Sequence, residues 1–318
     1  MTFTHKKNML VCSIFGVMAL VSNNSACAQV TPEVLKSIAI PNKVETPIGK
    51  LEFFDGVPTK ATVETVYDNL DRMRAVEVFL DNVGALSVYG VISGNASIGL
   101  SQPNQIAVAE KLLDSHSLYL TGNTSTMYSI GHLDLDAYGP TVVEVPPGML
   151  GMLDDAWMRF VENFGVAGPD RGKGGKYLVL PPNYKGEVPE GYFIVKAPTF
   201  TNWFFMRGSI ADGLAPALKN IKDNLKVYPL KSATNPPATE FVNITGKSYN
   251  TITPSDFNYF ESLNKIIQKE PLEALSVESR GLLAAIGIVK GKPFNPDARM
   301  KRLLTEAATI GDATARTT

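Results

Sequence analysis

The sequence contains few of the residues that build disulfide frameworks or zinc sites. Its 318 residues include two cysteines, Cys12 and Cys27, and three histidines. Both cysteines lie within the first 28 residues, so the rest of the chain cannot rely on disulfides and has little material for a zinc site. We therefore expect a conventional hydrophobic core, no metal and no cofactor.

A surplus of charge is also missing. Lys and Arg number 30, Asp and Glu number 31, and the formal net charge is -1. Binding of nucleic acid through bulk electrostatics needs a basic surface, so we expect no nucleic-acid partner. Hydrophobic residues make up 44% of the chain and charged residues 19%, which excludes a long disordered chain and predicts a packed core.

The apolar run at the N-terminus is too short to cross a membrane. It covers residues 9–21, whereas a membrane-spanning helix needs about 20 apolar residues. Two lysines precede the run, and residues 26–28 (Ala-Cys-Ala) supply the small residues of a cleavage site. This pattern predicts a secretory signal peptide over residues 1–28, with no membrane span after cleavage.

Cleavage there would release a periplasmic or secreted protein that begins at Gln29. Two alternatives remain open: an uncleaved anchor, and a lipoprotein modified at Cys27. The lipoprotein alternative is the weaker one, because Asn24 stands where a lipobox has an aliphatic residue.

Beyond the signal peptide, the hydrophobic pattern predicts three regions. Residues 29–95 are expected to form an extended segment and one long amphipathic helix, over 59–91, with Thr59 as its N-cap. Residues 96–245 hold short apolar runs between Gly, Pro and Asn clusters, which is typical of a β-sandwich. Residues 246–318 return to helical periodicity and are expected to pack with the N-terminal helix. The predicted fold class is α+β, an antiparallel β-sandwich flanked by a mostly helical module.

Individual elements follow from the same periodicity. Strands are predicted at 117–120, 128–133, 141–145, 177–180, 192–195, 202–207 and 240–244. Helices are predicted at 150–164 and 215–225, and after residue 253 at about 254–267, 277–288 and 296–310.

A glycine-rich basic segment, residues 165–176, invites comparison with a phosphate-binding loop. Its glycines lack the spacing of a Walker loop, and a strand rather than a helix follows it. A flexible basic loop is the simplest interpretation. The alternative is an anion site formed by Arg171, Lys173 and Lys176.

Acidic and histidine side chains suggest a second candidate. His132, Asp134 and Asp136 alternate, so in a strand all three would share one face and could form a hard-metal site or an acid–base pair. A solvated strand face explains the pattern equally simply. Residues 154–155 (Asp-Asp) could add carboxylates or begin a helix, and His116 is expected to be structural. The sequence has no Gly-x-Ser-x-Gly elbow, so Ser-His-Asp catalysis has no support.

Several segments together resemble the DUF1254 domain family. They are 120–128 (LTGNTSTMY), 139–147 (GPTVVEVPP), 155–157 (DAW), 168–178 (GPDRGKGGKYL), 181–182 (PP), 191–193 (GYF), 203–207 (WFFMR), 241–243 (FVN), 250–252 (NTI), 287–294 (GIVKGKPF) and 296–300 (PDARM). The resemblance covers nearly all of the chain beyond the signal peptide. It implies a β-sandwich joined to a helical module.

Two departures from the family pattern stand out. Family members usually have Asn-x-Asp-Thr where this chain has Ser125 in place of the aspartate. They also usually continue into a second domain, DUF1214, whereas this sequence ends at Thr318. A natural short form, a truncated gene product and one half of a two-part protein are the open alternatives. We therefore expect an apolar face on the last helix to be exposed, and to mediate homo-oligomerisation or binding of a separately encoded partner. The side chains of that face are Met300, Leu303, Leu304 and Ala307.

The resemblance implies no established reaction, so two functions are considered. The first is a non-catalytic binding or assembly module in the periplasm or outside the cell. The alternative is a hydrolase-like enzyme that acts on an envelope or extracellular small molecule, with a separate DUF1214-type partner. The candidate ligand-binding residues are Asn123, Tyr128, His132, Asp134, Trp203 and Arg207.

Arg207 has two interpretations. It closes an aromatic run, and a buried guanidinium needs a carboxylate, water or a ligand. One interpretation is a salt bridge to Asp134, Asp136 or Glu144. The other is an anion-binding role in a pocket with Asn123 and Tyr128.

Overall fold

The computed structural model describes residues 30–39, 41–102, 104–116, 118–119 and 122–317. The predicted signal peptide, residues 1–28, lies outside the described residues. The chain divides into two compact units, Met1–Thr62 and Val63–Thr318.

The first unit holds a short helix and an antiparallel meander of three strands. Its elements are α1 (Pro32–Ile38), β1 (Lys43–Thr46), β2 (Gly49–Phe54) and β3 (Val57–Pro58). The meander leads to Thr59, whose Oγ1 accepts a hydrogen bond from the Thr62 N–H at 3.2 Å. This bond confirms Thr59 as the N-cap of the helix that follows.

The predicted single helix over 59–91 is wrong, because two helices occupy this region. α2 (Lys60–Asp81) and α3 (Val83–Ser97) meet at a bend of 58°. Asn82 lies at the break with a non-helical backbone, and its buried Oδ1 accepts a hydrogen bond from Trp157 Nε1 at 2.9 Å. At the break, the buried amide oxygen of Asn82 and the indole N–H of Trp157 therefore serve as each other's hydrogen-bond partners.

Two sheets make up the β-structure of the second unit. The larger has the strand order β13-β4-β5-β11-β7-β8, and the smaller has the order β10-β9-β6-β12. The strands are β4 (Gln105–Val108), β5 (Met127–Asp134), β6 (Thr141–Val145), β7 (Leu150–Asp155), β8 (Phe160–Gly165), β9 (Gly175–Leu180), β10 (Phe193–Lys196), β11 (Thr201–Gly208), β12 (Lys226–Pro229) and β13 (Glu240–Asn243).

The α+β class is confirmed, but the sheets are mixed. β13 runs parallel to β4, and β10 runs parallel to β9. The expectation of a purely antiparallel arrangement is therefore wrong at these two edges. Both edge strands arrive after long connections rather than hairpins, and such connections permit parallel pairing.

The helix predicted at 150–164 is instead the β7–β8 hairpin. β7 pairs with β8 and also with β11, so it is an inner strand of the larger sheet. The carboxylate of Asp155 closes the turn by accepting hydrogen bonds from the N–H groups of Trp157 and Arg159. Sheet pairing on both sides overrides the helix-like spacing of the apolar residues.

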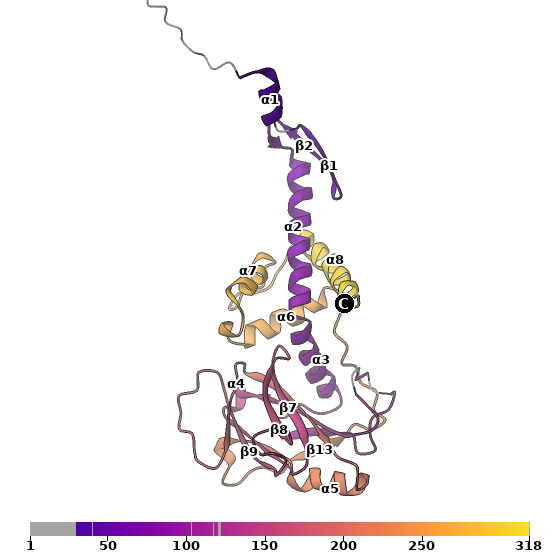
Figure 1. Cartoon of the computed structure of the whole chain (residues 1–318), viewed down its shortest axis with the longest axis vertical. Coiled ribbons are helices and arrows are strands. Elements are labelled where there is room, and N and C mark those ends of the chain that lie inside the picture. Colours follow the sequence, from indigo (N-terminus) through magenta and orange to yellow (C-terminus); the bar gives the residue numbers. More distant parts are fainter. Residues whose placement is uncertain (1–29, 40, 103, 117, 120–121, 318) are drawn as a thin grey trace, which may run out of the picture. The chain divides into compact units, whose positions relative to one another are not determined.

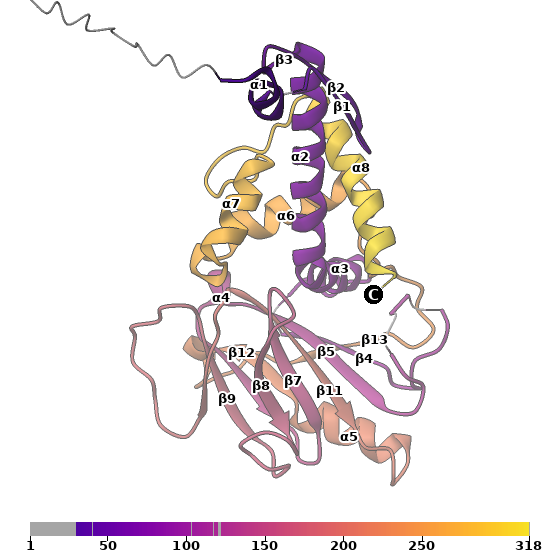
Figure 2. The ribbon, with the colours of Figure 1, turned by 45° about the horizontal axis from the view of Figure 1, so that its top comes forward.

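The larger sheet has one hydrophobic core on each face. One core contains residues of both sheets and of α5 (Leu214–Asn224), including Phe204, Val143 and Ile221. The core on the opposite face contains residues of α3, including Val88 and Val91. Figures 1 and 2 show α3 lying across that face, which carries the candidate site described below.

Three further helices build a third core together with α2 and α3. They are α6 (Asn258–Lys269), α7 (Val277–Ala285) and α8 (Ala298–Ala315). The expected exposure of the last helix is wrong, because Leu303, Leu304 and Ala307 are fully buried. The predicted end of this helix at residue 310 is also wrong, because α8 continues through Gly311 to Ala315. Gly311 does not end the helix; instead, its missing side chain leaves room for the ring of Phe79.

Among the described residues, no single helix is long and apolar enough to span a membrane. The bent pair of α2 and α3 meets the length and composition requirements when the two helices are taken together.

Candidate functional site

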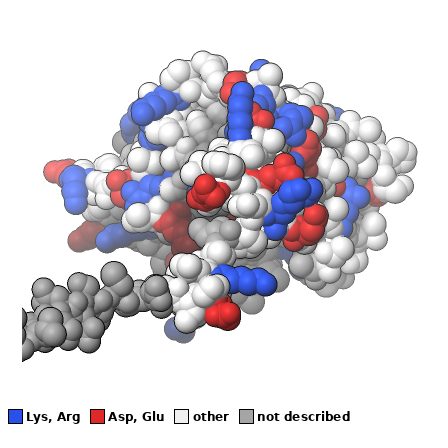
Figure 3. Space-filling model, turned by 90° about the horizontal axis from the view of Figure 1, so that it is seen from above, with Lys and Arg blue, Asp and Glu red and all other residues white. Residues whose placement is uncertain are grey.

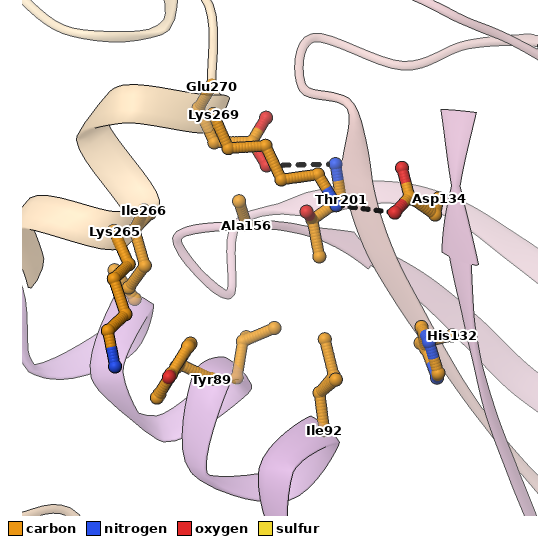
Figure 4. Close-up of a pocket in the computed structure, with 12 residues that line it drawn as sticks. Tyr89, Ile92, His132, Asp134, Ala156, Thr201, Lys265, Ile266, Lys269 and Glu270 are labelled. Carbon is orange, nitrogen blue, oxygen red and sulfur yellow. Dashed lines mark hydrogen bonds and ion pairs between the residues drawn. The ribbon is translucent and has the colours of Figure 1, made fainter. Parts of the chain in front are cut away.

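A cavity of about 240 Å³ lies between α3, α6 and the larger sheet. Its apolar wall is formed by Ala85, Val88, Tyr89, Ile92, Ala156 and Ile266. Its polar lining is formed by His132, Asp134, Thr201, Lys265, Lys269 and Glu270. Figure 4 shows His132 on the strand side, with Tyr89 and Ile92 facing it from α3.

Two periodicities bring these side chains together. The α3 residues are spaced 85, 88, 89 and 92, which places them on one face of a helix. In β5, residues 132 and 134 alternate onto one face of the sheet. The antiparallel register then sets Trp203 opposite His132 and Thr201 opposite Asp134.

An ion pair closes the upper side of the cavity. Lys269 Nζ donates to Asp134 Oδ2 at 2.7 Å, and Asp134 Oδ1 accepts from the Ala137 N–H at 3.2 Å. Asp134 therefore caps the short helix α4 (Leu135–Tyr138) and neutralises Lys269. The predicted row of three alternating side chains is wrong, because β5 ends at Asp134 and Asp136 lies exposed in α4.

Glu270 ties α6 to the sheet. Its carboxylate accepts hydrogen bonds from the N–H groups of Phe200, at 2.6 Å, and Thr201, at 3.0 Å. Burial raises the pKa of Glu270, although these hydrogen bonds favour the ionised form. Lys290 donates to carbonyl groups of the last turn of α6, among them that of Gln268 at 2.9 Å. Glu270 thus positions the cavity wall rather than offering a free carboxylate.

His132 is one of the titratable groups that line the cavity. Burial lowers its pKa, Lys269 lowers it further, and Asp134 acts in the opposite direction. The imidazole is therefore neutral at neutral pH. Its ring nitrogens have no hydrogen bond with the described residues, so they remain available to a ligand.

Beside His132, the strand register forms a row of three side chains across the larger sheet. Trp203 lies between His132 on β5 and Asp154 on β7. Trp203 Nε1 is buried and has no hydrogen-bond partner among the described residues. Asp154 is 5% exposed, and burial together with Asp155 raises its pKa to about 6.

Asn123, Tyr128 and Arg207 lie at the other end of β5 and β11. Tyr128 is four residues from His132, or about 13 Å along the strand. The Asn123 N–H donates to the Tyr128 hydroxyl at 3.0 Å, and Asn123 Oδ1 accepts from Thr126 Oγ1 at 2.8 Å. The structure thus separates the six predicted ligand-binding residues into two groups: His132 and Asp134 line the cavity, with Trp203 paired to His132 on the neighbouring strand, and the other three lie at the far end of these strands.

Arg207 is exposed and forms no ion pair with a described carboxylate. Its guanidinium lies 5.8 Å from the ring centre of Tyr128 and 5.3 Å from that of Phe205. The expected salt bridge to Asp134, Asp136 or Glu144 is therefore wrong. Cation–π contacts and solvent stabilise the charge instead.

The basic loop is ordered by a buried carboxylate. Asp170 accepts hydrogen bonds from the Tyr177 hydroxyl, at 2.6 Å, and from the Gly174 N–H, at 2.9 Å. Lys176 lies 3.3 Å from Glu144, so its charge is paired, whereas Arg171 and Lys173 are exposed. These hydrogen bonds of Asp170 stabilise the loop conformation.

Sequence reasoning missed the helical half of the site. Ala85 and Ile92 belong to an apolar stripe that predicts core packing, and Lys269 and Glu270 end an ordinary amphipathic helix. Asp154 was recognised only as one of two adjacent acids. Within the part of the chain that the structure describes, no three His, Asp or Glu side chains are grouped as metal ligands.

These features define an α+β protein with two mixed sheets and a helix-covered cavity on one face of the larger sheet. Residues 103–229 match the family model DUF1254, "Protein of unknown function (DUF1254)". The chain therefore contains a DUF1254 domain, as the sequence motifs predict, and this domain supplies the strands β4 to β12.

One solved structure with a similar fold is the VPA0106 protein from Vibrio parahaemolyticus. It superposes with a TM-score of 0.57 at 17% sequence identity, over 78% of this chain and 59% of that chain. The chain thus spans about three fifths of the length of that protein, and the likeness concerns the fold alone. No curated protein is significantly similar to the chain.

Proposed function

We propose that this protein is an exported, non-catalytic binding module that holds a small, mostly apolar molecule in the cavity between α3, α6 and the larger sheet. The observation that carries the proposal is the pairing of an apolar helical wall with a neutral, unpartnered His132. Ligand sites usually combine an apolar lining with a few such polar groups.

The cavity volume limits the size of the ligand. An engineered apolar cavity of about 150 Å³ binds benzene, so about 240 Å³ suits one ring with a short substituent. Most polar groups of the lining already have partners, such as Lys269 with Asp134. A ligand therefore gains affinity mainly from apolar burial and from few hydrogen bonds.

The test uses benzene, benzyl alcohol, benzylamine and benzoate as probes of matched size. At least one should raise the melting temperature of the wild type, since a ligand that binds only the folded state stabilises it. Ala85→Leu and Ile92→Phe should abolish the rise by filling the cavity, whereas Ala96→Leu, on an exposed position of α3, should retain it. The proposal is wrong if no probe stabilises the wild type, or if Ala85→Leu and Ile92→Phe respond as the wild type does.

Hydrolysis is the second candidate function, and His132 is the observation that favours it. A neutral imidazole facing a cavity can act as a general base on water. Turnover of small aryl esters by the wild type, lost in His132→Gln, would support this function. Equal turnover by the two proteins would contradict it.

Export remains part of the proposal, supported by the pattern of residues 1–28. Intact mass of protein recovered from the periplasm or medium of a bacterial host should correspond to a chain that begins at Gln29. A retained N-terminus, or lipid on Cys27, would contradict this expectation.

We further propose that the two sheets form a sandwich, and that the protein associates with a second copy or a separate partner. The core that both sheets share supports the first proposal. With the apolar side chains of α8 buried, the exposed apolar side chains of α2 support the second.

A further inference from the structure

The acidic side chains that line the cavity already have donors. Asp134 is neutralised by Lys269, whose Nζ lies 2.7 Å from Asp134 Oδ2. Glu270 accepts hydrogen bonds from the N–H groups of Phe200 and Thr201, and Figure 4 shows its carboxylate directed toward Thr201. The described lining therefore offers no free carboxylate to a cationic ligand.

Lys265 is the charged residue of the lining that has no partner. It forms no hydrogen bond or ion pair with any residue that the structure describes. Because it precedes Lys269 by four residues on α6, the two ammonium groups share one helical face, and like charges at this spacing destabilise a helix. Asp134 compensates the charge of Lys269 and leaves that of Lys265 without a partner.

Lys265 also lies at the side of the cavity that is open to solvent. Its side chain is exposed, whereas Ala85 and Ile266 in the same lining are buried. Figure 4 shows Lys265 on the helical side of the cavity, opposite His132. A ligand with an apolar body and one charged end can therefore bury its body and keep its charge near water, where the cost of desolvation is lowest.

We propose that the ligand of the cavity is a small organic monocarboxylate with an apolar body, whose carboxylate pairs with Lys265. This inference rests on the proposed binding function and names the chemical class of the ligand. The body extends between Ile92 and Ile266 toward His132. A single negative charge is specified because one ammonium group is free, and the second charge of a phosphate would have no partner.

The experiment compares benzoate, benzyl alcohol and benzylamine by titration calorimetry at neutral pH. Benzoate should bind about fivefold or more tightly than benzyl alcohol, and benzylamine should bind most weakly because its charge has the sign of Lys265. Lys265→Met keeps an unbranched apolar side chain and removes the charge. It should abolish the preference for benzoate, while benzyl alcohol binds as before. About 1 M salt should also reduce the preference in the wild type, since it screens a pair near the surface.

Two controls separate the pairing from general effects. Lys265→Arg keeps the charge and should retain the preference, and Lys247→Met, which removes an exposed lysine outside the lining, should bind all three probes as the wild type does. The carboxylate inference is wrong if benzoate binds no more tightly than benzyl alcohol, or if Lys265→Met keeps the ratio of the wild type. In both cases binding of benzyl alcohol, blocked by Ala85→Leu, would leave the proposed function standing, whereas failure of every probe would overturn both.

Discussion

At the scale of single residues, Asp154 links the stability of the fold to pH. Its pKa in the folded chain is about 6, against 3.8 for the free side chain. Between these values the folded state binds more protons than the unfolded state, so the free energy of unfolding falls as pH rises through this window. Above about pH 6 the full cost of the buried charge is present.

We expect Asp154→Asn to raise the free energy of unfolding by roughly 1–2 kcal/mol near pH 8 and to change it little near pH 4. An amide has the same shape and carries no charge, so the substitution removes the cost only where the wild type is ionised. Urea unfolding at the two pH values measures the difference. A stabilisation of equal size at both pH values, or a loss near pH 8, would contradict the argument.

Gly131, in contrast, is a residue whose identity the packing requires. A Cβ atom there would stand 2.3 Å from Cζ of Phe204, whose buried ring covers the glycine on the neighbouring strand. We expect Gly131→Ala to destabilise the fold by about 2 kcal/mol, because the ring cannot move within a packed core without strain. Gly281→Ala in α7 is the matched control, since nothing lies within 4 Å and helix propensity favours alanine. Thermal unfolding should therefore show a lower melting temperature for Gly131→Ala and a higher one for Gly281→Ala than for the wild type.

At the scale of elements, a network of ion pairs joins α2 to α8. Arg299 donates to Asp68 at 2.6 Å and to Asp71 at 2.9 Å, and Arg302 donates to Asp68 at 2.7 Å. Hydrogen bonds from Arg302 and then Arg299 lower the pKa of Asp68 despite its partial burial. A lowered carboxyl pKa stabilises the fold above the unfolded value, and this contribution is lost as pH falls through the folded value.

Arg299→Ala should accordingly lower the melting temperature at neutral pH more than Arg316→Ala does. Arg316 forms one exposed pair with Asp312, and such pairs contribute little. The difference between the melting temperatures of the two variants should become smaller in acid, where the carboxylates are protonated. It should also become smaller in about 1 M salt, which screens the ion pairs of the network. A difference that persists under both conditions would mean that Arg299 acts through packing instead.

The elements also show what the sequence can and cannot predict. Long apolar runs such as those of β5 and β11 were predicted within two residues, because their period is unambiguous. β4 and β12 were missed, since four residues carry too little pattern. In the segment of β7 and β8, the apolar residues at 150, 153, 157, 160 and 164 follow a helical period. The segment forms strands because β7 pairs with β11, and the sequence pattern does not show this pairing. His132 could be predicted from alternation, but Ala85 and Ile266 reach it only through tertiary packing.

At the scale of the whole molecule, the charges are balanced and mixed. Seen from above, basic and acidic side chains are interspersed on the surface (Figure 3), in keeping with a net charge of -1. A mixed surface gives no strong attraction to polyanions, and association must depend on apolar patches. The exposed apolar side chains of α2 form such a patch: Val66 39%, Tyr67 57%, Met73 57% and Leu80 37% exposed.

We predict that the exposed apolar side chains of α2 mediate self-association. Val66, Met73 and Leu80 recur at steps of seven residues, so they share one helical face that a second copy can cover, whereas Tyr67 lies about 100° round the helix from Val66. We expect the wild type to show concentration-dependent self-association in sedimentation equilibrium, and Val66→Glu or Met73→Glu to weaken it about tenfold or more by placing a charge in the contact. Val277→Glu, at a position that is 78% exposed on α7, adds the same charge elsewhere and should leave the association unchanged. A wild type that remains monomeric at high concentration would exclude self-association through α2 and leave a separately encoded partner as the occupant to seek.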